Sequence, residues 1–226
     1  MLRLENISAG YRGRCIVEGV SLEVSAGECI LVCGANGSGK TTLLKTAAGV
    51  IRPLSGTVVC DGTMVLVPTG IPKVPGFTLR EFIRTGCYRD TDIWGRASAS
   101  LGHGIGKAME LLEISHLADR DISQVSDGEF QKACIASALT RNAEVMLFDE
   151  PTAFLDLDSR VTVLRALRKI AAERNVAVLF SSHDIYESAP VCTRMIGISS
   201  AGRFVDSSLS SKEDVLSQCF TSLRKD

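Results

Sequence analysis

The 226-residue sequence lacks several features that would point to particular classes of protein. Its apolar runs fall short of the roughly 18 consecutive apolar residues that a membrane-spanning helix needs. The formal net charge is only −1, so no excess of basic residues favours nucleic acid or an anionic membrane surface. The sequence does not begin with basic residues followed by an apolar segment, the pattern of a secretory signal. We therefore expect one sizeable globular domain that reaches a membrane, if at all, through a partner.

The eight cysteines form neither a metal site nor a redox pair in the sequence. There is no C-x-x-C pair and no Cys/His cluster with zinc-like spacing. Several cysteines lie in apolar runs, where cysteine behaves as a small core residue. Cys29 and Cys33 in particular would share one face of a strand. These features favour a reduced, cytosolic protein.

The most specific motif is a glycine-rich loop between an apolar strand and a helix. Residues 28–33 have the pattern of a strand and residues 41–50 that of an amphipathic helix. Residues 34–42 follow the strand and run into the helix. They read Gly-Ala-Asn-Gly-Ser-Gly-Lys-Thr-Thr, the order of a P-loop. Glycine tolerates the backbone angles that let N–H groups surround a phosphate chain.

Two side chains of the loop add to this interpretation. Lys40 can reach the terminal phosphates, and Thr41 can offer its hydroxyl to Mg²⁺, while the helix N-terminus favours an anion. The alternative is a glycine-rich turn that only caps a helix. It is less favoured because strand, loop, Lys-Thr pair and helix all occur in order. The sequence therefore predicts binding of a nucleoside triphosphate.

A pair of acids ends a second apolar strand. Residues 144–148 run directly into Asp149 and Glu150. In open α/β sheets, ligands bind at the C-terminal ends of the strands. Asp149 can hold Mg²⁺ there, and Glu150 can polarise an attacking water as a general base. An acid pair that only caps a strand end is the alternative, and the P-loop argues against it.

Two further patterns allow both a structural and a functional interpretation. His183 follows the strand-like residues 175–180, so we expect its side chain within reach of a γ-phosphate, although a lone histidine is more often structural. Ser126 and Glu129 have the spacing of a capping box that opens a helix over residues 128–141. The free N–H groups of that helix start would also favour an anion, so the two interpretations are compatible.

The remaining pattern predicts an α/β fold. Residues 2–8 and 20–24 alternate like strands, and residues 57–60 and 63–67 flank an Asp-Gly pair, which predicts a hairpin. Residues 88–103 have the composition of a polar loop. Helical periodicity is found at residues 79–84, 105–117, 128–141, 158–173 and 212–223. Nearly continuous apolar strands that alternate with helices predict a buried, mostly parallel sheet.

Together these motifs resemble the nucleotide-binding subunit of an ATP-binding cassette (ABC) transporter over about residues 2–205. Residues 34–42 match its Walker A, residues 125–131 resemble its signature, and residues 148–150 match its Walker B with the catalytic glutamate. Residues 151–156 resemble the D-loop and His183 the switch histidine. Tyr11 falls where the family has an aromatic residue that stacks on adenine, a packed strand-end tyrosine being the alternative.

The resemblance implies a P-loop NTPase (RecA-like) α/β fold over residues 1–226. It would have a mostly parallel sheet, an N-terminal antiparallel β subdomain and an inserted α-helical subdomain at roughly residues 77–141. The implied catalytic residues are Glu150 and His183, and the implied magnesium ligands are Thr41, Asp149 and Thr69. The implied nucleotide-binding residues are Tyr11, Gly34, Asn36, Gly37, Ser38, Gly39, Lys40, Thr41, Thr42, Ser126, Gly128, Glu129 and Asp156.

The implied activity is ATP hydrolysis with ATP and Mg²⁺ bound. Two copies would sandwich two ATP molecules head to tail, each between the Walker A of one chain and the signature of the other. The implied partners are transmembrane permease subunits and, indirectly, a substrate-binding protein, with no nucleic acid. The subunit would lie in the cytoplasm on the inner face of the cell membrane.

The cargo is suggested only by short strings. Residues 126–129 (Ser-Asp-Gly-Glu), 149–156 and 116–120 resemble the branch that imports iron chelates, haem or cobalamin. The alternative is a non-transport ATPase of the same family, such as that of iron–sulfur cluster assembly. The importer-like helix at residues 130–139 favours transport.

Two positions depart from the family pattern. Where the family has its Q-loop glutamine, this sequence has Val-Pro-Thr69, and the shorter threonine hydroxyl would reach Mg²⁺ only through water. Asp127 replaces the first glycine of the signature, and its carboxylate would repel a γ-phosphate. We therefore expect it to point away, toward the helix N-terminus, where the dipole stabilises it. These departures leave open a third interpretation, an ATP sensor that binds but scarcely hydrolyses.

Overall fold

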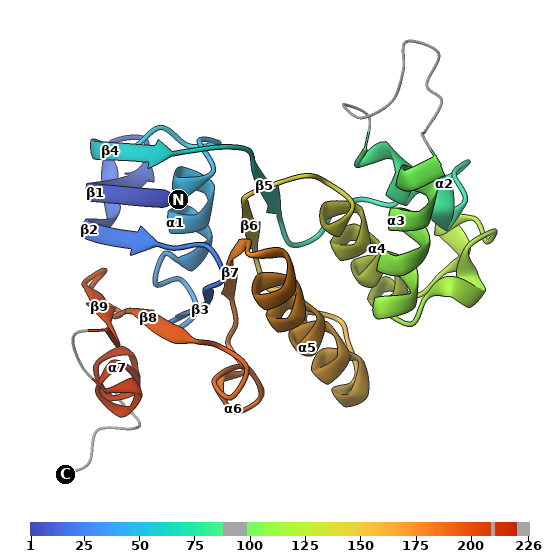
Figure 1. Cartoon of the computed structure of the whole chain (residues 1–226). Helices are drawn as coiled ribbons and strands as arrows, with labels where there is room; N and C mark the ends of the chain where they lie inside the picture. The colour runs from blue at the N-terminus through green and yellow to red at the C-terminus, as the bar shows by residue number, and fades with distance from the viewer. Residues whose placement is uncertain (88–98, 209–210, 221–226) are drawn as a thin grey trace. The chain divides into compact units, whose positions relative to one another are not determined.

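The computed structural model describes residues 1–87, 99–208 and 211–220 (Figure 1). Contacts divide the chain into two compact units. Unit 1 comprises Met1–Leu66, Ala143–Glu150 and Leu167–Asp226, and unit 2 comprises Val67–Asn142 and Pro151–Ala166. The sequence-based limits of the helical subdomain, roughly residues 77–141, remain a prediction. Among the described residues, no helix is both long enough and apolar enough to cross a membrane.

Two sheets form the framework of unit 1. The antiparallel sheet has the order β2-β1-β4 and consists of β1 (Leu2–Tyr11), β2 (Arg14–Val24) and β4 (Ser55–Cys60). The second sheet has the order β5-β6-β7-β3-β8-β9. Its strands are β3 (Cys29–Cys33), β5 (Met64–Val67), β6 (Val145–Phe148), β7 (Ala177–Ser181), β8 (Arg194–Ile198) and β9 (Phe204–Asp206). Strands β6, β7, β3 and β8 are parallel, which confirms the predicted sheet, and β9 is antiparallel.

Along the chain, helices lie between the parallel strands β3, β6, β7 and β8 (Figure 1). They are α1 (Lys40–Ala47), α2 (Leu79–Thr85), α3 (Ala99–Leu111), α4 (Asp127–Leu139), α5 (Leu157–Arg174), α6 (Ile185–Ser188) and α7 (Lys212–Cys219), with 3-10 turns at Ser115–Leu117 and Ile122–Gln124. The helix predicted at residues 105–117 corresponds to α3, which begins and ends six residues earlier. Of the expected polar loop, residues 88–98 lie outside the described residues, and the rest belongs to α3.

The hairpin predicted around Asp61 and Gly62 is wrong. Strand β4 pairs with β1, with Leu2 opposite Cys60, whereas β5 lies beside β6 in the other sheet. Asp61 N donates to Met1 O at 3.0 Å, which holds this side of the turn to the antiparallel sheet. The Asp-Gly pair indicates a turn but cannot choose strand partners, because strand pairing depends on packing against distant neighbours.

One hydrophobic core joins both sheets and α1. Alternate residues of β1 and β2, such as Leu4 and Val20, pack with Leu43 of α1 and with Val32 and Leu147 of the parallel sheet. Each is almost completely buried, and burying an apolar side chain of this size contributes roughly 1.5–3 kcal/mol. The core therefore fixes α1 against β3 and positions the loop between them.

Helix α7 packs closely on β8. A Cβ built at Gly197 would lie 2.8 Å from Val215 Cγ1 and would clash with Cys219 Sγ. The hydrogen bond between the thiols of Cys33 and Cys219, together with burial, raises the pKa of Cys33. Burial likewise raises the pKa of Cys29 to about 12. These cysteines are protonated core residues, as their apolar surroundings in the sequence predict.

Replacing Gly197 with alanine is expected to lower the free energy of unfolding by about 1–3 kcal/mol, the usual cost of overpacking a filled core. Urea unfolding followed by circular dichroism measures the change. Gly106 of α3 offers a matched control, because its added Cβ meets no described atom within 4 Å. G106A should be neutral or slightly stabilising, since alanine favours helices. A G197A variant as stable as the natural chain would contradict the close packing of β8 and α7.

Candidate functional site

The loop between β3 and α1 depends on three glycines with positive φ. Their φ angles are 151° at Gly34, 78° at Gly37 and 111° at Gly39. A Cβ at Gly34 would lie 2.5 Å from Ile198 O and 2.6 Å from Ser38 Oγ, so only glycine fits. Because other residues would be strained in these conformations, the glycines determine a path whose N–H groups can bind an anion.

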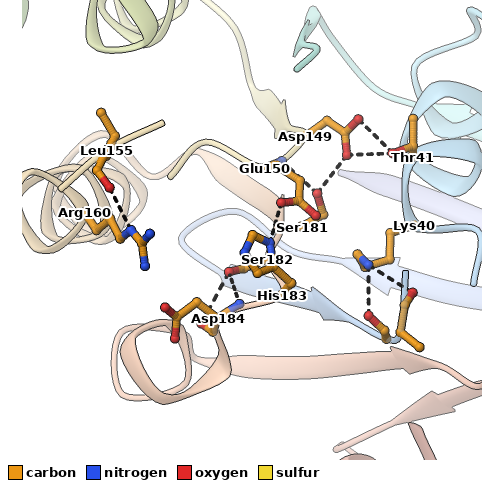
Figure 2. A network of polar contacts seen from close by, with 12 residues as sticks. Lys40, Thr41, Asp149, Glu150, Leu155, Arg160, Ser181, Ser182, His183 and Asp184 are labelled. Carbon is orange, nitrogen blue, oxygen red and sulfur yellow. Dashed lines mark hydrogen bonds and ion pairs between the residues drawn. The ribbon is translucent and has the colours of Figure 1, made fainter. Parts of the chain in front are cut away.

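Lys40 and Ser38 carry polar atoms suited to a phosphate. Lys40 is only 6% exposed, and its Nζ donates to Gly34 O at 2.9 Å and to Ala35 O at 3.2 Å (Figure 2). A phosphate oxygen would be a stronger acceptor than these neutral carbonyls because it is charged. Ser38 Oγ is buried and has no hydrogen-bond partner in the described part of the chain. Such an orphaned polar atom in the loop fits a bound phosphate.

Two hollows that share residues are lined by the predicted nucleotide residues of unit 1 except Gly34. The first, of about 390 Å³, is lined by Ile16, Asn36, Gly37, Gly39, Lys40, Thr41, Thr42 and Glu150. The second, of about 520 Å³, shares Gly37 with the first and extends past Ser38 to Tyr11 at the end of β1. Tyr11 is 45% exposed, so its ring is accessible to a flat ligand.

Asp149 is the centre of the polar network in Figure 2. It follows β6 and is 4% exposed. Thr41 Oγ1 lies 3.0 and 2.9 Å from its two carboxylate oxygens, and Ser181 Oγ donates to Oδ1 at 2.8 Å. Because the strand order is β6-β7-β3, the C-terminal ends of these strands, which lead to the three residues, lie side by side. Hydroxyl and carboxylate oxygens are the ligands that Mg²⁺ prefers, so Thr41 and Asp149 fit a magnesium site.

Ser181 is a site residue that the motifs in the sequence do not reveal. It is completely buried at the end of β7. Its Oγ accepts a hydrogen bond from Glu150 N at 2.8 Å while donating to Asp149. One hydroxyl therefore orients both acids. The only signal in the sequence is its position, two residues before His183 on a strand next to β6.

Glu150 and His183 form a close pair. Glu150 Oε2 lies 2.6 Å from His183 Nδ1 (Figure 2), and the side chains are 22% and 58% exposed. Glu150 has a φ of 51°, a sparsely populated conformation outside glycine that is common at functional sites. Because β7 pairs with β6, His183 is brought to the acid pair. A carboxylate held in this way can accept a proton from a water molecule.

The signature residues form the N-terminus of α4 in unit 2. Ser126 Oγ accepts from Glu129 N at 3.1 Å, and Glu129 Oε2 accepts from Ser126 N at 2.7 Å, so the predicted capping box is confirmed. The hydrogen bond from Ser126 N lowers the pKa of Glu129. A Cβ at Gly128 would lie 2.9 Å from Phe154 O. Ser126, Gly128, Glu129 and Asp156 line a single hollow of about 530 Å³.

Three other positions in unit 2 complete the comparison with the sequence. Asp127 forms an ion pair with Lys73 at 2.7 Å, a partner that the sequence does not indicate. Asp156 Oδ1 accepts from Ser159 N at 2.8 Å at the start of α5, and this hydrogen bond lowers its pKa. Thr69 belongs to unit 2, whereas the other two predicted magnesium ligands belong to unit 1. Its role as a ligand remains a prediction.

Comparison with known proteins identifies the family. The family model described as ABC transporter matches residues 17–153. The chain belongs to the ABC transporter family. It is 34% identical to an uncharacterised ABC transporter ATP-binding protein of Methanocaldococcus jannaschii, over 86% of this chain and 72% of that protein. It is 30% identical to the iron(3+)-hydroxamate import ATP-binding protein of Bacillus subtilis and 27% identical to the ferric enterobactin transport ATP-binding protein of Escherichia coli, each over 87% of this chain and 78% of the relative.

Solved ABC structures share the fold. A transporter described as of metal-chelate type, in an inward-facing conformation, matches with a TM-score of 0.84 and 23% identity over 97% of this chain and 88% of that chain. A dimeric ATP-binding cassette in a post-hydrolysis state with ADP and Pi matches with a TM-score of 0.77 and 22% identity over 91% and 98%. This ABC subunit is therefore an ATPase with the predicted P-loop α/β fold. ATPase subunits of the family dimerise and pair with permease subunits.

In this ABC ATPase, replacing Ser181 with alanine is expected to lower the free energy of unfolding by about 1–3 kcal/mol, because a buried carboxylate and a buried N–H lose their shared partner. Urea unfolding measures the loss, and the rate of phosphate release should fall with it. S217A is the control, since among the described residues Ser217 Oγ bonds Asp214 O of its own helix alone and should change stability by less than about 0.5 kcal/mol. Equal stability of the two variants would contradict the role of Ser181.

Proposed function

We propose that this chain hydrolyses ATP to power a permease that imports an iron chelate or a similar metal-containing cargo. The observation that carries the proposal is a network of hydrogen bonds beyond the C-terminal ends of adjacent parallel strands (Figure 2). It joins Thr41, Asp149, Ser181, Glu150 and His183. The donors and acceptors that it gathers beside one loop support roles in binding a phosphate, a cation and an attacking water.

The phosphates of ATP would lie in the loop between β3 and α1. The residues assigned to them are Gly34, Asn36, Gly37, Ser38, Gly39, Lys40, Thr41 and Thr42. Backbone N–H groups and the N-terminus of α1 would face the phosphate oxygens. Lys40 Nζ would exchange its two carbonyl acceptors for phosphate oxygens, and Tyr11 would stack on the adenine ring. The hollows at these residues support this assignment.

Thr41 and Asp149 would hold Mg²⁺. Their hydroxyl and carboxylate oxygens, 2.9 and 3.0 Å apart, support the assignment. When bound, Mg²⁺ neutralises charge on the phosphate oxygens. Ser181 orients the Asp149 carboxylate toward this position by holding Oδ1.

Glu150 would act as the general base. Its Oε2 is held by His183, and its main-chain N–H is held by Ser181. The carboxylate is thereby fixed to accept a proton from the water that attacks the γ-phosphate. His183 would orient Glu150 and lie close to the same phosphate.

Two copies would complete each site between them. Ser126, Gly128, Glu129 and Asp156 of one copy would face the ATP held in the loop of the other, so the two copies would lie head to tail. Their common hollow and the N-terminus of α4, whose dipole favours an anion, support this assignment. Closing the pair around ATP and reopening it after hydrolysis would move the permease at the cytoplasmic face of the membrane.

The cargo follows from the named relatives. Those named for ferric enterobactin, iron(3+)-hydroxamate and achromobactin transport share 27–30% identity with this chain, one named for siderophore transport shares 26%, and another is named for zinc import. Metal chelates are therefore the favoured class. A substrate-binding protein would deliver the chelate to the permease.

Replacing Glu150 with glutamine is expected to slow phosphate release by about 10²–10⁴-fold, the usual contribution of a general base, and to leave ATP binding intact. K40A should lose ATP binding instead, because the ammonium is the charged donor of the loop. K45A, one turn further along α1, is the control and should bind and hydrolyse normally. Phosphate release and equilibrium binding of a fluorescent ATP analogue separate the two effects. An E150Q variant that hydrolyses ATP at the normal rate would refute the assignment of the base.

The transport role is tested by affinity purification of the tagged chain from detergent-solubilised membranes. A multi-span permease should co-purify, and deletion of the chain should abolish uptake of radioactive iron from a ferric siderophore. The natural chain should restore uptake and E150Q should not. Recovery of iron–sulfur scaffold proteins without any permease would favour the non-transport alternative.

A further inference from the structure

Asp127 places a negative charge where the proposed function needs an anion to bind. Under that function, the start of α4 faces the γ-phosphate of ATP held by the second copy. Asp127 and Glu129 both lie in the first turn of α4, where acids stabilise the helix dipole but repel a phosphate. Glu129 is engaged by the N–H of Ser126 in the capping box. The charge of Asp127 therefore needs a separate counter-charge.

Lys73 supplies that counter-charge. Its Nζ lies 2.7 Å from Asp127 Oδ1, donates to Val125 O at 2.7 Å, and is 5.8 Å from the centre of the Phe130 ring. The Lys73 side chain is 23% exposed, whereas that of Asp127 is 76% exposed. The mostly buried Lys73 side chain is thus held against the exposed carboxylate of Asp127 by Val125 O and the Phe130 ring.

The segment that carries Lys73 is fixed to the residues preceding α4. Gly76 N donates to Asp121 Oδ2 at 3.0 Å, and Ile122 N donates to Phe77 O at 2.9 Å. All of these residues belong to unit 2. The position of Lys73 relative to Asp127 is therefore determined within one compact unit.

We propose that Lys73 is a positioning residue for the ATP-dependent association of two copies. By neutralising Asp127, it keeps the start of α4 able to accept the γ-phosphate of ATP bound to the partner copy. The inference rests on the proposed function, because it requires Ser126 and Gly128 to face that nucleotide. Lys73 acts through Asp127 and through Val125 O.

A purely structural role for Lys73 gives a different expectation. If Lys73 only secured unit 2 through Val125 O and the Phe130 ring, removing the charge of Asp127 would not compensate for the loss of Lys73. If charge neutralisation is the function, an uncharged residue at position 127 makes Lys73 dispensable. The two roles are therefore separated by a double substitution.

The experiment measures dimerisation of the full chain against ATP concentration in the E150Q background, with Mg²⁺, by sedimentation velocity. K73Q keeps a donor for Val125 O but loses the charge, and should raise the ATP concentration for half-maximal dimerisation about tenfold, which corresponds to about 1.4 kcal/mol. K73Q combined with D127N should return close to the E150Q parent. K73R, which retains the charge, should also stay close to the parent.

The matched control is the ion pair of Arg80 and Asp119 in the same unit, 3.7 Å apart with side chains 52% and 91% exposed. R80Q should leave dimerisation unchanged, because this pair does not contact the start of α4. Binding of a fluorescent ATP analogue to dilute single copies should be equal in all variants. Thermal unfolding shows whether each variant is folded.

Two different failures are distinguishable. If E150Q itself does not dimerise with ATP, the proposed sandwich fails and this inference fails with it. If E150Q dimerises but K73Q does so at the same ATP concentration, or D127N does not restore the K73Q variant, the inference alone is overturned.

Discussion

The buried carboxylate of Asp149 is the contact on which the geometry of the site depends. A charge that is 4% exposed is tolerated only when it is well hydrogen-bonded. Thr41 and Ser181 meet this requirement from two other chain segments. The parallel order β6-β7-β3 brings these segments to one edge of the sheet. Ser181 also holds the N–H of Glu150, so the position of the second acid depends on the same contact.

The start of α4 follows the same physical rule in unit 2. Glu129 is held by an N–H group of its own helix end, whereas Asp127 is held by a lysine from a distant segment. In both arrangements each carboxylate of an acid-rich helix start has its own hydrogen-bonding partner. Gly128 further allows the chain at Phe154 to approach the helix closely. The signature and the D-loop are therefore packed as one surface.

Much of the fold can be predicted from contiguous patterns. The apolar runs that form β3, β6 and β7 are fully buried, and their uninterrupted hydrophobicity indicates a parallel sheet. The glycine-rich loop, the acid pair and the capping box are also contiguous, so their residue types and spacing are visible in the sequence. The sequence patterns do not predict strands β8 and β9, because Gly197 interrupts the first and the second has only three residues. The hairpin at Asp61 and Gly62 was wrong because the turn signal does not specify strand partners.

The sequence by itself determined the nucleotide loop, the acids at the end of β6 and the helix cap at Ser126, since each arises from neighbouring residues with fixed backbone preferences. Only the tertiary structure decided that Ser181 joins Asp149 to Glu150 and that Lys73 pairs with Asp127. These contacts join residues far apart in the chain. Their partners are selected by the burial of whole strands and helices, which no local pattern encodes.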